Sequence, residues 1–146
     1  MPNRNEALFG PAGNCEAFYA AGHNSTVQVF GWRRAQGLTA YEYQCGRGVR
    51  VSADAAAAIR RAAGENGIAV SVHAPYFISL ASAEEEKRDN SIRYILDSAR
   101  AVDAMGGDRI VVHPGGLGGR SRAEAAAIAC DTLMRAQAAL DGNGLG

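Results

Sequence analysis

Two histidines stand at corresponding places in two apolar segments. His73 follows Ala69–Val72 and precedes Ala74-Pro75 in "AVSVHAPY", and His113 precedes Pro114-Gly115 forty residues later in "RIVVHPGG". Histidine is a common metal ligand, and a proline that stops a strand fixes where the chain leaves it. The pair predicts a metal or phosphate site at two strand ends. The alternative is that each histidine is a hydrogen-bonded strand-end residue without a ligand.

Strand-forming segments recur along the chain and must position these histidines. Four of them are rich in Val, Ile, Tyr and Phe, and we expect strands at Ala7–Gly10, Ala40–Gln44, Ala69–His73 and Arg109–His113. Their spacing of about 30 to 40 residues is the length of one strand followed by one helix.

Helix start and stop signals lie between these strands. Ser82 with Glu85, and Ser121 with Glu124, have the spacing of capping boxes. The first of these two helices is expected to end at Gly106, and another helix is expected from Ser52 to a Gly67 stop. The first interstrand segment, residues 14–36, is less regular because Gly22 and Gly31 interrupt it.

Regular alternation of strand and helix predicts an α/β fold with parallel strands joined by right-handed crossovers. Such a sheet is either open and doubly wound or closed into a barrel. No G-x-G-x-x-G motif follows the first expected strand, which disfavours a dinucleotide-binding open sheet. A (β/α)8 TIM barrel takes eight units and roughly 250 residues. We therefore interpret residues 1–146 as the amino-terminal half of a single TIM-barrel domain, with its first four units.

Side-chain alternation places His73 on the barrel interior and Val72 on the side of the helices. Adjacent parallel strands lie about 4.8 Å apart, so His73 and His113 could contribute to one metal ion or one phosphate. A zinc site that does chemistry usually has three protein ligands. Glu42 is the nearest carboxylate candidate, either as a ligand or as a residue that supports the ligands from behind.

Three further residues could contact a substrate at the same face. Arg47 and Arg50 lie in the glycine-flexible loop "CGRGVR" and could hold phosphates, although a solvated loop is an equal alternative. Tyr76 could stack on a base or sugar, or pack against the barrel rim.

Bulk composition bounds the class of protein. The chain has 146 residues, 47% hydrophobic and 21% charged, as expected for one soluble globular domain. It has no apolar run of about 18 residues and no signal-peptide pattern. Three cysteines without a C-x-x-C pair favour a reducing, cytoplasmic setting. A net charge of zero excludes nucleic-acid binding by bulk charge and leaves a local basic patch open.

The runs "SVHAPYFISLAS" and "EEEKRDNSIRYILDSARAVDAMGGDRIVVHPGG" resemble the third and fourth strand units of the endonuclease IV family (AP endonuclease family 2), within the xylose-isomerase-like barrels. The resemblance implies a zinc-dependent phosphodiesterase that cleaves DNA at abasic sites during repair, with a cluster of three zinc ions. It implies that His73 and His113 bind one zinc together with a carboxylate from the fifth strand. It also implies that Tyr76 lies near the DNA.

Three functions follow as expectations. The first is an endonuclease IV-like nuclease, inactive as this chain alone because the remaining ligands of the family come from strands five to eight. The second is a sugar isomerase or epimerase on the same barrel, with a small sugar as substrate. The third is a non-catalytic half-barrel that only binds a ligand or pairs with a second chain, and we expect this chain to self-associate or to be weakly folded. Zinc is the expected cofactor, multinuclear in the complete barrel, with manganese and magnesium as alternatives. The sequence assigns no catalytic residue.

Overall fold

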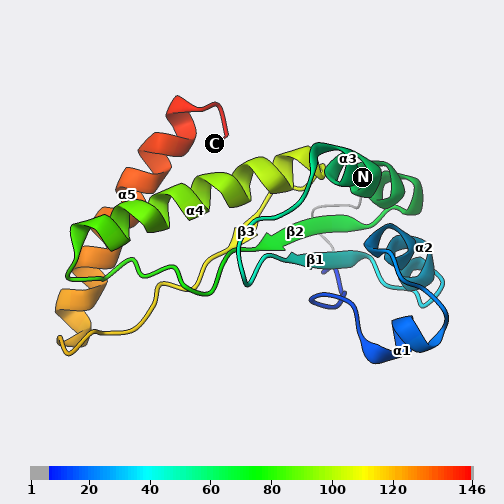
Figure 1. The fold of residues 1–146 in the computed structure, drawn as a ribbon, viewed down its shortest axis with the longest axis horizontal. Coiled ribbons are helices and arrows are strands. Elements are labelled where there is room, and N and C mark those ends of the chain that lie inside the picture. The colour runs from blue at the N-terminus through cyan, green and yellow to red at the C-terminus, as the bar shows by residue number, and fades with distance from the viewer. Residues whose placement is uncertain (1–6, 146) are drawn as a thin grey trace. The chain divides into compact units, whose positions relative to one another are not determined.

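The computed structural model describes residues 7–145 and shows helices alternating with strands (Figure 1). Within these residues, three strands form one parallel sheet in the order β1-β2-β3. This confirms the predicted α/β class. The elements in chain order are α1 (Glu16–Ala20), the 3-10 helix η1 (Thr26–Gln28), α2 (Val29–Arg34), β1 (Ala40–Gln44), α3 (Ala53–Asn66), β2 (Ala69–His73), α4 (Glu85–Ala104), β3 (Ile110–Val111) and α5 (Arg122–Gly142).

The prediction of a strand at Ala7–Gly10 is wrong. The chain runs beside β1 there, but the pairing is reduced to an isolated parallel bridge between Ala12 and Glu42. Pro11 has no N–H to continue a ladder. Gly10 passes so close to β1 that a Cβ on it would lie 1.6 Å from the carbonyl oxygen of Ala40. The close approach of Gly10 to Ala40 and the missing N–H of Pro11 therefore account for the absence of the expected strand.

The strands β1 and β2 have the predicted bounds, whereas β3 is shorter than the predicted Arg109–His113. Pro114 explains the early end of β3, because its carbonyl oxygen accepts a hydrogen bond from Leu80 N (2.9 Å) and its ring nitrogen donates none. The chain therefore turns into its loop at this point. His113 consequently lies just after β3 and not within it.

Side chains alternate along β2 and β3 as predicted. Val72 is fully buried, whereas His73, which points to the other side of the strand, is half-buried. Ile110 and Val112 pack against buried side chains, whereas His113 is exposed. Val72 and the residues around β3 that pack inward thus alternate with His73 on β2 and with His113 just after β3.

The chain divides into two compact units. The first has an aromatic core in which Phe30 meets Tyr41 edge to face, with ring centres 5.4 Å apart. The second has an aliphatic core that includes Leu80 and Ile95. The first unit comprises the residues up to Gln44, Val51–Val72 and Ala101–Arg109, and the second comprises Cys45–Arg50, His73–Arg100 and the residues from Ile110 onward.

Two of the three predicted serine-initiated helices begin as expected. The side chain of Ser52 accepts a hydrogen bond from Ala55 N at the start of α3, and Gly67 ends that helix with a left-handed φ of 62°. Ser121 and Glu124 form a reciprocal capping box at the start of α5. These starts were predictable because a cap requires only neighbours in sequence.

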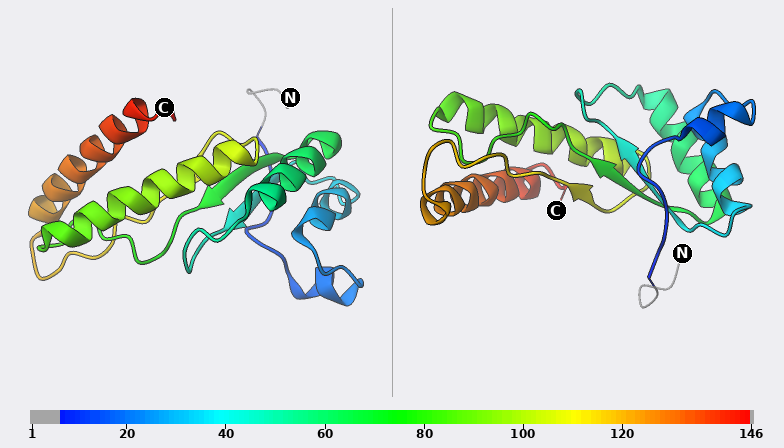
Figure 2. Two further views of the ribbon diagram at one scale, coloured as in Figure 1. Left: turned by 45° about the horizontal axis from the view of Figure 1, so that its top comes forward. Right: turned by 90° about the horizontal axis from the view of Figure 1, so that it is seen from below.

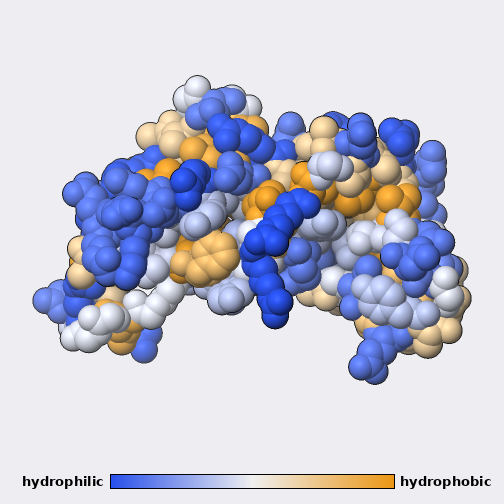
Figure 3. Space-filling view, viewed as in Figure 1, coloured by the Kyte–Doolittle hydropathy of each residue, from blue (hydrophilic) through white to orange (hydrophobic). Residues whose placement is uncertain are grey.

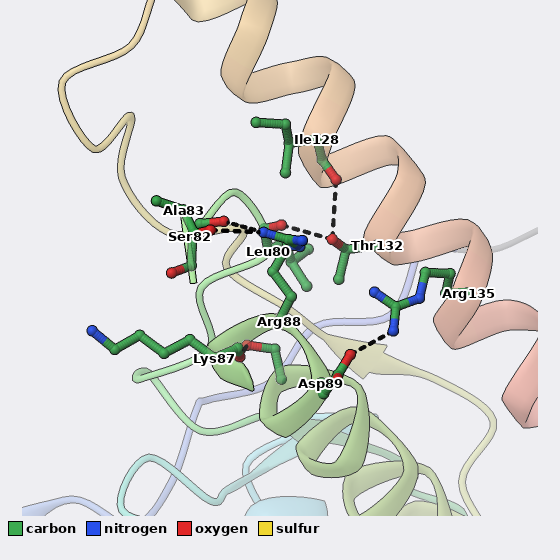
Figure 4. Close-up of polar contacts among 10 residues, drawn as sticks. Leu80, Ser82, Ala83, Lys87, Arg88, Asp89, Ile128, Thr132 and Arg135 are labelled. Atoms are coloured by element: carbon green, nitrogen blue, oxygen red, sulfur yellow. Dashed lines mark hydrogen bonds and ion pairs between the residues drawn. The ribbon is translucent and has the colours of Figure 1, made fainter. Parts of the chain in front are cut away.

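The predicted capping box of Ser82 and Glu85 is wrong. The helix α4 begins at Glu85, and the Ser82 hydroxyl accepts from Glu84 N at 3.2 Å. The Arg88 guanidinium donates to the carbonyl oxygens of Ser82 (2.6 Å) and Ala83 (3.3 Å), as Figure 4 shows. The Arg88 side chain thus takes up the Ser82 carbonyl, and α4 begins two residues later than a Ser82 cap would have allowed.

The helices α4 and α5 run side by side in the views of Figure 2. Thr132 has no exposed surface, and its hydroxyl lies 2.8 Å from the Leu80 carbonyl oxygen and 3.0 Å from that of Ile128 (Figure 4). Arg135 on α5 pairs with Asp89 on α4. Apolar burial and these polar contacts together fix α5 on the second unit.

Hydrophilic residues gather over the first turns of α4 on the face drawn in Figure 3. Glu84 and Lys87 form an exposed ion pair there. Exposed pairs of this kind contribute little to stability.

None of the helices within residues 7–145 is long and apolar enough to cross a membrane.

Candidate functional site

The backbone brings the two predicted histidines together. Ala74 N, directly after β2, donates to the carbonyl oxygen of Val111 at 2.9 Å, and Cys45 N donates to that of His73 at 3.0 Å. These bonds fix the carboxyl end of β2 relative to its neighbours in the second unit. The Nε2 atoms of His73 and His113 then lie 3.0 Å apart, with ring centres 4.9 Å apart.

A backbone contact determines the tautomer of His73. Its Nδ1 lies 2.9 Å from the carbonyl oxygen of Ala74, which can only accept a hydrogen bond. Nδ1 therefore carries a proton, and in the neutral ring Nε2 presents a lone pair. The 3.0 Å contact between the rings follows if His113 donates from its own Nε2. Ligand histidines commonly donate their second ring N–H to a carbonyl in this way.

The pair fits two positions of a metal site. A tetrahedral zinc with Zn–N bonds of about 2.0–2.1 Å separates two ligand nitrogens by about 3.3 Å. The observed 3.0 Å between the Nε2 atoms needs only a small opening of the rings, and His113 must carry its proton on Nδ1. Among residues 7–145, no three His, Cys, Asp or Glu side chains come together as a possible metal site. The described residues thus offer two imidazole donors.

The loops after β2 and β3 hold each other in place behind the histidines. Pro75 is fully buried, and Leu80 N donates to the Pro114 carbonyl at 2.9 Å. Gly115 has a φ of 90°, and a Cβ there would lie 3.1 Å from Ser79 Cα. Only a glycine fits this left-handed position easily. The prolines predicted to fix the loop exits therefore lie within a tightly packed pair of loops.

Tyr76 and the two predicted arginines also belong to the second unit. Tyr76 N donates to the Gly46 carbonyl at 3.2 Å, which holds the arginine-bearing loop beside the tyrosine. The Tyr76 side chain is 66% exposed, so it is not packed against a rim within the described residues. Arg47 and Arg50 are exposed, and neither forms an ion pair with a carboxylate of residues 7–145.

One aromatic residue beside this site was not predicted. Phe77 is 43% exposed, with its ring 5.6 Å from that of Tyr76 and 4.7 Å from that of Tyr94, both edge to face. The signal in the sequence is the pair of adjacent aromatics after His73 and Pro75. Tyr76 and Phe77 together form a small exposed aromatic surface.

Glu42 and Cys45 each have surroundings of their own. Glu42 belongs to the first unit, where its carboxylate accepts a hydrogen bond from Gln44 at 3.1 Å. Cys45 is buried, and burial raises the pKa of its thiol, so it stays protonated near neutral pH.

The family of the chain follows from residues 30–145, which match the model of the xylose isomerase-like TIM barrels. The chain belongs to the xylose isomerase-like TIM barrel family. A probable endonuclease 4 of Mycoplasmoides gallisepticum is 41% identical to it over 44 residues, 30% of this chain and 14% of that protein.

Solved structures of other proteins share the fold. A 3-keto-D-glucoside 4-epimerase from E. coli superimposes with a TM-score of 0.65 and 19% identity, over 84% of this chain and 49% of the epimerase. Endonuclease IV from Thermus thermophilus superimposes with a TM-score of 0.55 and 24% identity, over 76% of this chain and 42% of that enzyme. The chain thus spans less than half of these structures, and matches its curated relatives over less than a third of their length. These likenesses support the predicted barrel fold.

Proposed function

We propose that this chain supplies metal ligands and DNA contacts to an endonuclease IV-like phosphodiesterase that acts on abasic sites. The observation that carries the proposal is the 3.0 Å approach of the His73 and His113 Nε2 atoms at the ends of neighbouring strands. Active sites of TIM barrels lie at the carboxyl ends of the strands. The matched relative named as a probable endonuclease 4 supports the same class.

Zinc is the metal that this donor set favours. Imidazole suits zinc, whereas magnesium prefers oxygen ligands. When bound, such a metal polarises a phosphodiester and supplies a hydroxide near neutral pH. In this proposal His73 and His113 hold one ion of a larger cluster, and the Ala74 carbonyl keeps the His73 proton on Nδ1, away from the metal.

DNA contacts come from the exposed residues beside the histidines. Arginine guanidinium groups bind phosphate through paired N–H donors, and Arg47 and Arg50 have no carboxylate that competes for them among residues 7–145. An exposed aromatic ring such as Tyr76 or Phe77 can stack on a base, or it can enter the space left by a missing base. The three unpaired thiols are consistent with a cytoplasmic location.

Zinc binding tests the ligand assignment directly. We expect His73→Ala and His113→Ala each to weaken zinc binding by at least tenfold, as measured by competition with a chromogenic chelator. His23→Ala is the matched control, because His23 stacks on Phe18 in the first unit, with ring centres 5.0 Å apart. Zinc affinity that is unchanged in both strand-end variants would contradict the assignment.

A sugar epimerase is the second candidate. The observation that favours it is the net charge of zero, because enzymes that bind DNA usually add basic surface. A protein that contains this chain within a complete barrel distinguishes the two. Metal-dependent cleavage of a duplex with one abasic site supports the nuclease, whereas epimerisation of a keto-sugar without cleavage supports the epimerase.

A further inference from the structure

Arg33, in the first unit, is a buried cation without a carboxylate partner among residues 7–145. Its side chain is 8% exposed, and its guanidinium carbon lies 4.4 Å from the centre of the Trp32 ring. Nη1 donates to the amide oxygen of Gln36 at 3.0 Å. A buried charge is costly unless an opposite charge compensates for it. The remaining donors of Arg33 therefore indicate where an anion belongs.

Those donors point to a cysteine. Nη2 of Arg33 lies 3.3 Å from Sγ of Cys15, and Nε is buried with no hydrogen-bond partner within the described residues. In a planar guanidinium, Nε–H and one Nη2–H lie on the same edge and bind anions in pairs. One donor of this edge contacts the sulfur, and the other is free. The edge therefore suits an anionic sulfur group with a second acceptor atom.

The surroundings of Cys15 favour its thiolate. The backbone N–H of Phe18 has the largest lowering effect on the pKa of the Cys15 thiol, and the hydrogen bond and charge of Arg33 lower it further against opposing desolvation. Glu16 follows Cys15 as the first residue of α1, and Tyr41 lies on β1 with a pKa raised mainly by burial, so Tyr41 stays neutral. Cys15 is also exposed, so small reagents reach the sulfur.

We propose that Cys15 is a peroxide-reactive site whose thiolate and sulfenate forms are held by the Arg33 guanidinium. The thiolate sulfur attacks one oxygen of hydrogen peroxide, an S–O bond forms and the O–O bond breaks. The second oxygen leaves as hydroxide, and Cys15 becomes a sulfenic acid. Sulfur is oxidised and peroxide is reduced, so the step needs no other reactant. The new oxygen supplies the second acceptor for the guanidinium edge.

The other two cysteines are internal references. Cys130 is exposed on α5, and no cation within residues 7–145 donates a hydrogen bond to it. Cys45 is buried. Cys130 therefore reports the reactivity of an exposed thiol without a guanidinium, whereas labelling of Cys45 reports unfolding. All three thiols can be followed in one sample by peptide mass spectrometry.

The first experiment uses the unmodified 146-residue chain. It is treated with a small excess of hydrogen peroxide at neutral pH in the presence of dimedone, which traps sulfenic acids. We expect at least threefold more adduct on Cys15 than on Cys130, because thiolate fraction outweighs the accompanying loss of nucleophilicity. Equal labelling, or more labelling of Cys130, would overturn the proposal.

The second experiment assigns the role of Arg33. In Arg33→Gln, the pH midpoint for alkylation of Cys15 by iodoacetamide should rise, and the dimedone adduct should fall by about threefold. Arg34→Gln is the matched control, since Arg34 is the exposed neighbour on the same helix. If Arg33→Gln exposes Cys45, Arg33→Lys replaces it as the test, with a smaller rise expected. An unchanged midpoint in a variant that protects Cys45 excludes Arg33 as the partner of the thiolate.

Discussion

Thr132 illustrates how a single polar side chain secures a helix. Its hydroxyl has one proton and two carbonyl acceptors within reach, one on the loop after β2 and one in its own helix. The Leu80 carbonyl lies in a buried region, and an unsatisfied buried acceptor carries a desolvation penalty. The position therefore requires a donor even though its surroundings are apolar.

Replacement of this hydroxyl tests its contribution. We expect Thr132→Val, which keeps the shape and removes the donor, to lower the free energy of unfolding by about 1 to 3 kcal/mol. Thr132→Ser keeps the donor and should retain more stability than Thr132→Val. Urea unfolding followed by circular dichroism measures both. A valine variant as stable as the original protein would show that the Leu80 carbonyl needs no partner.

At the same scale, the sequence predicted one approach of two side chains and missed two other features of single residues. The approach of His73 and His113 was predictable, because the two histidines stand at corresponding places beside paired neighbouring strands. The exposure of Phe77 and, elsewhere in the chain, the burial of Arg33 were not predictable, because both depend on contacts with distant segments. Ser82 was predicted as a cap, but Arg88 competes for its carbonyl.

The start of α5 combines a cap with a charge. Ser121 and Glu124 bond each other reciprocally, and the hydrogen bonds from Ser121 are the main cause of the lowered pKa of the Glu124 carboxyl. A carboxyl whose pKa is lower in the folded state stabilises the fold at every pH above its ordinary pKa of 4.5. That contribution is lost as the pH falls through the lowered value.

A pair of cap variants separates these two contributions. Ser121→Ala should cost about 1 kcal/mol at neutral pH, and the cost should shrink below pH 4.5 as Glu124 becomes protonated in both proteins. Ser52→Ala removes the cap of α3, where the third helical residue is Ala55 and carries no charge. Its cost should not change with this protonation. Urea unfolding over a pH series measures both, and parallel profiles would refute the coupling.

At the scale of elements, local signals were sufficient for helices and incomplete for strands. The helix α3 has its predicted cap and stop, and β1 and β2 have their predicted bounds. The predicted strand at Ala7–Gly10 failed because a steric limit at Gly10 depends on how near β1 lies. Composition cannot reveal such a distance.

Over the whole molecule, charges balance, with 15 basic and 15 acidic residues. Non-specific attraction to DNA should therefore be weak, and any binding should depend on a few placed cations. Arg47 and Arg50 are the candidates that the second unit presents beside Tyr76. The dependence of DNA affinity on salt concentration reports the number of such contacts between cations and phosphates.

We expect the salt dependence of DNA binding to weaken in Arg47→Gln and in Arg50→Gln. For a duplex with an abasic analogue, the negative slope of log affinity against log salt should become shallower by about one in each variant. Arg61→Gln is the control, because Arg61 is an exposed arginine of α3 in the first unit. Fluorescence anisotropy at several salt concentrations measures the slopes. Equal slopes in all three variants would remove these arginines from the proposed DNA contacts.

The orientation of the His73 ring has a consequence for sequence change. Its Nδ1 partner is the main-chain carbonyl of Ala74, which every amino acid at that position provides. A ligand histidine oriented by an aspartate loses its tautomer when that aspartate mutates, but here no side chain can be lost. The orientation of the His73 ring thus depends on the path of the main chain. Substitutions at position 74 are limited only by the small buried space around Ala74. Pro75 fixes the path of the chain, so a substitution of Pro75 would disturb the His73 ring most.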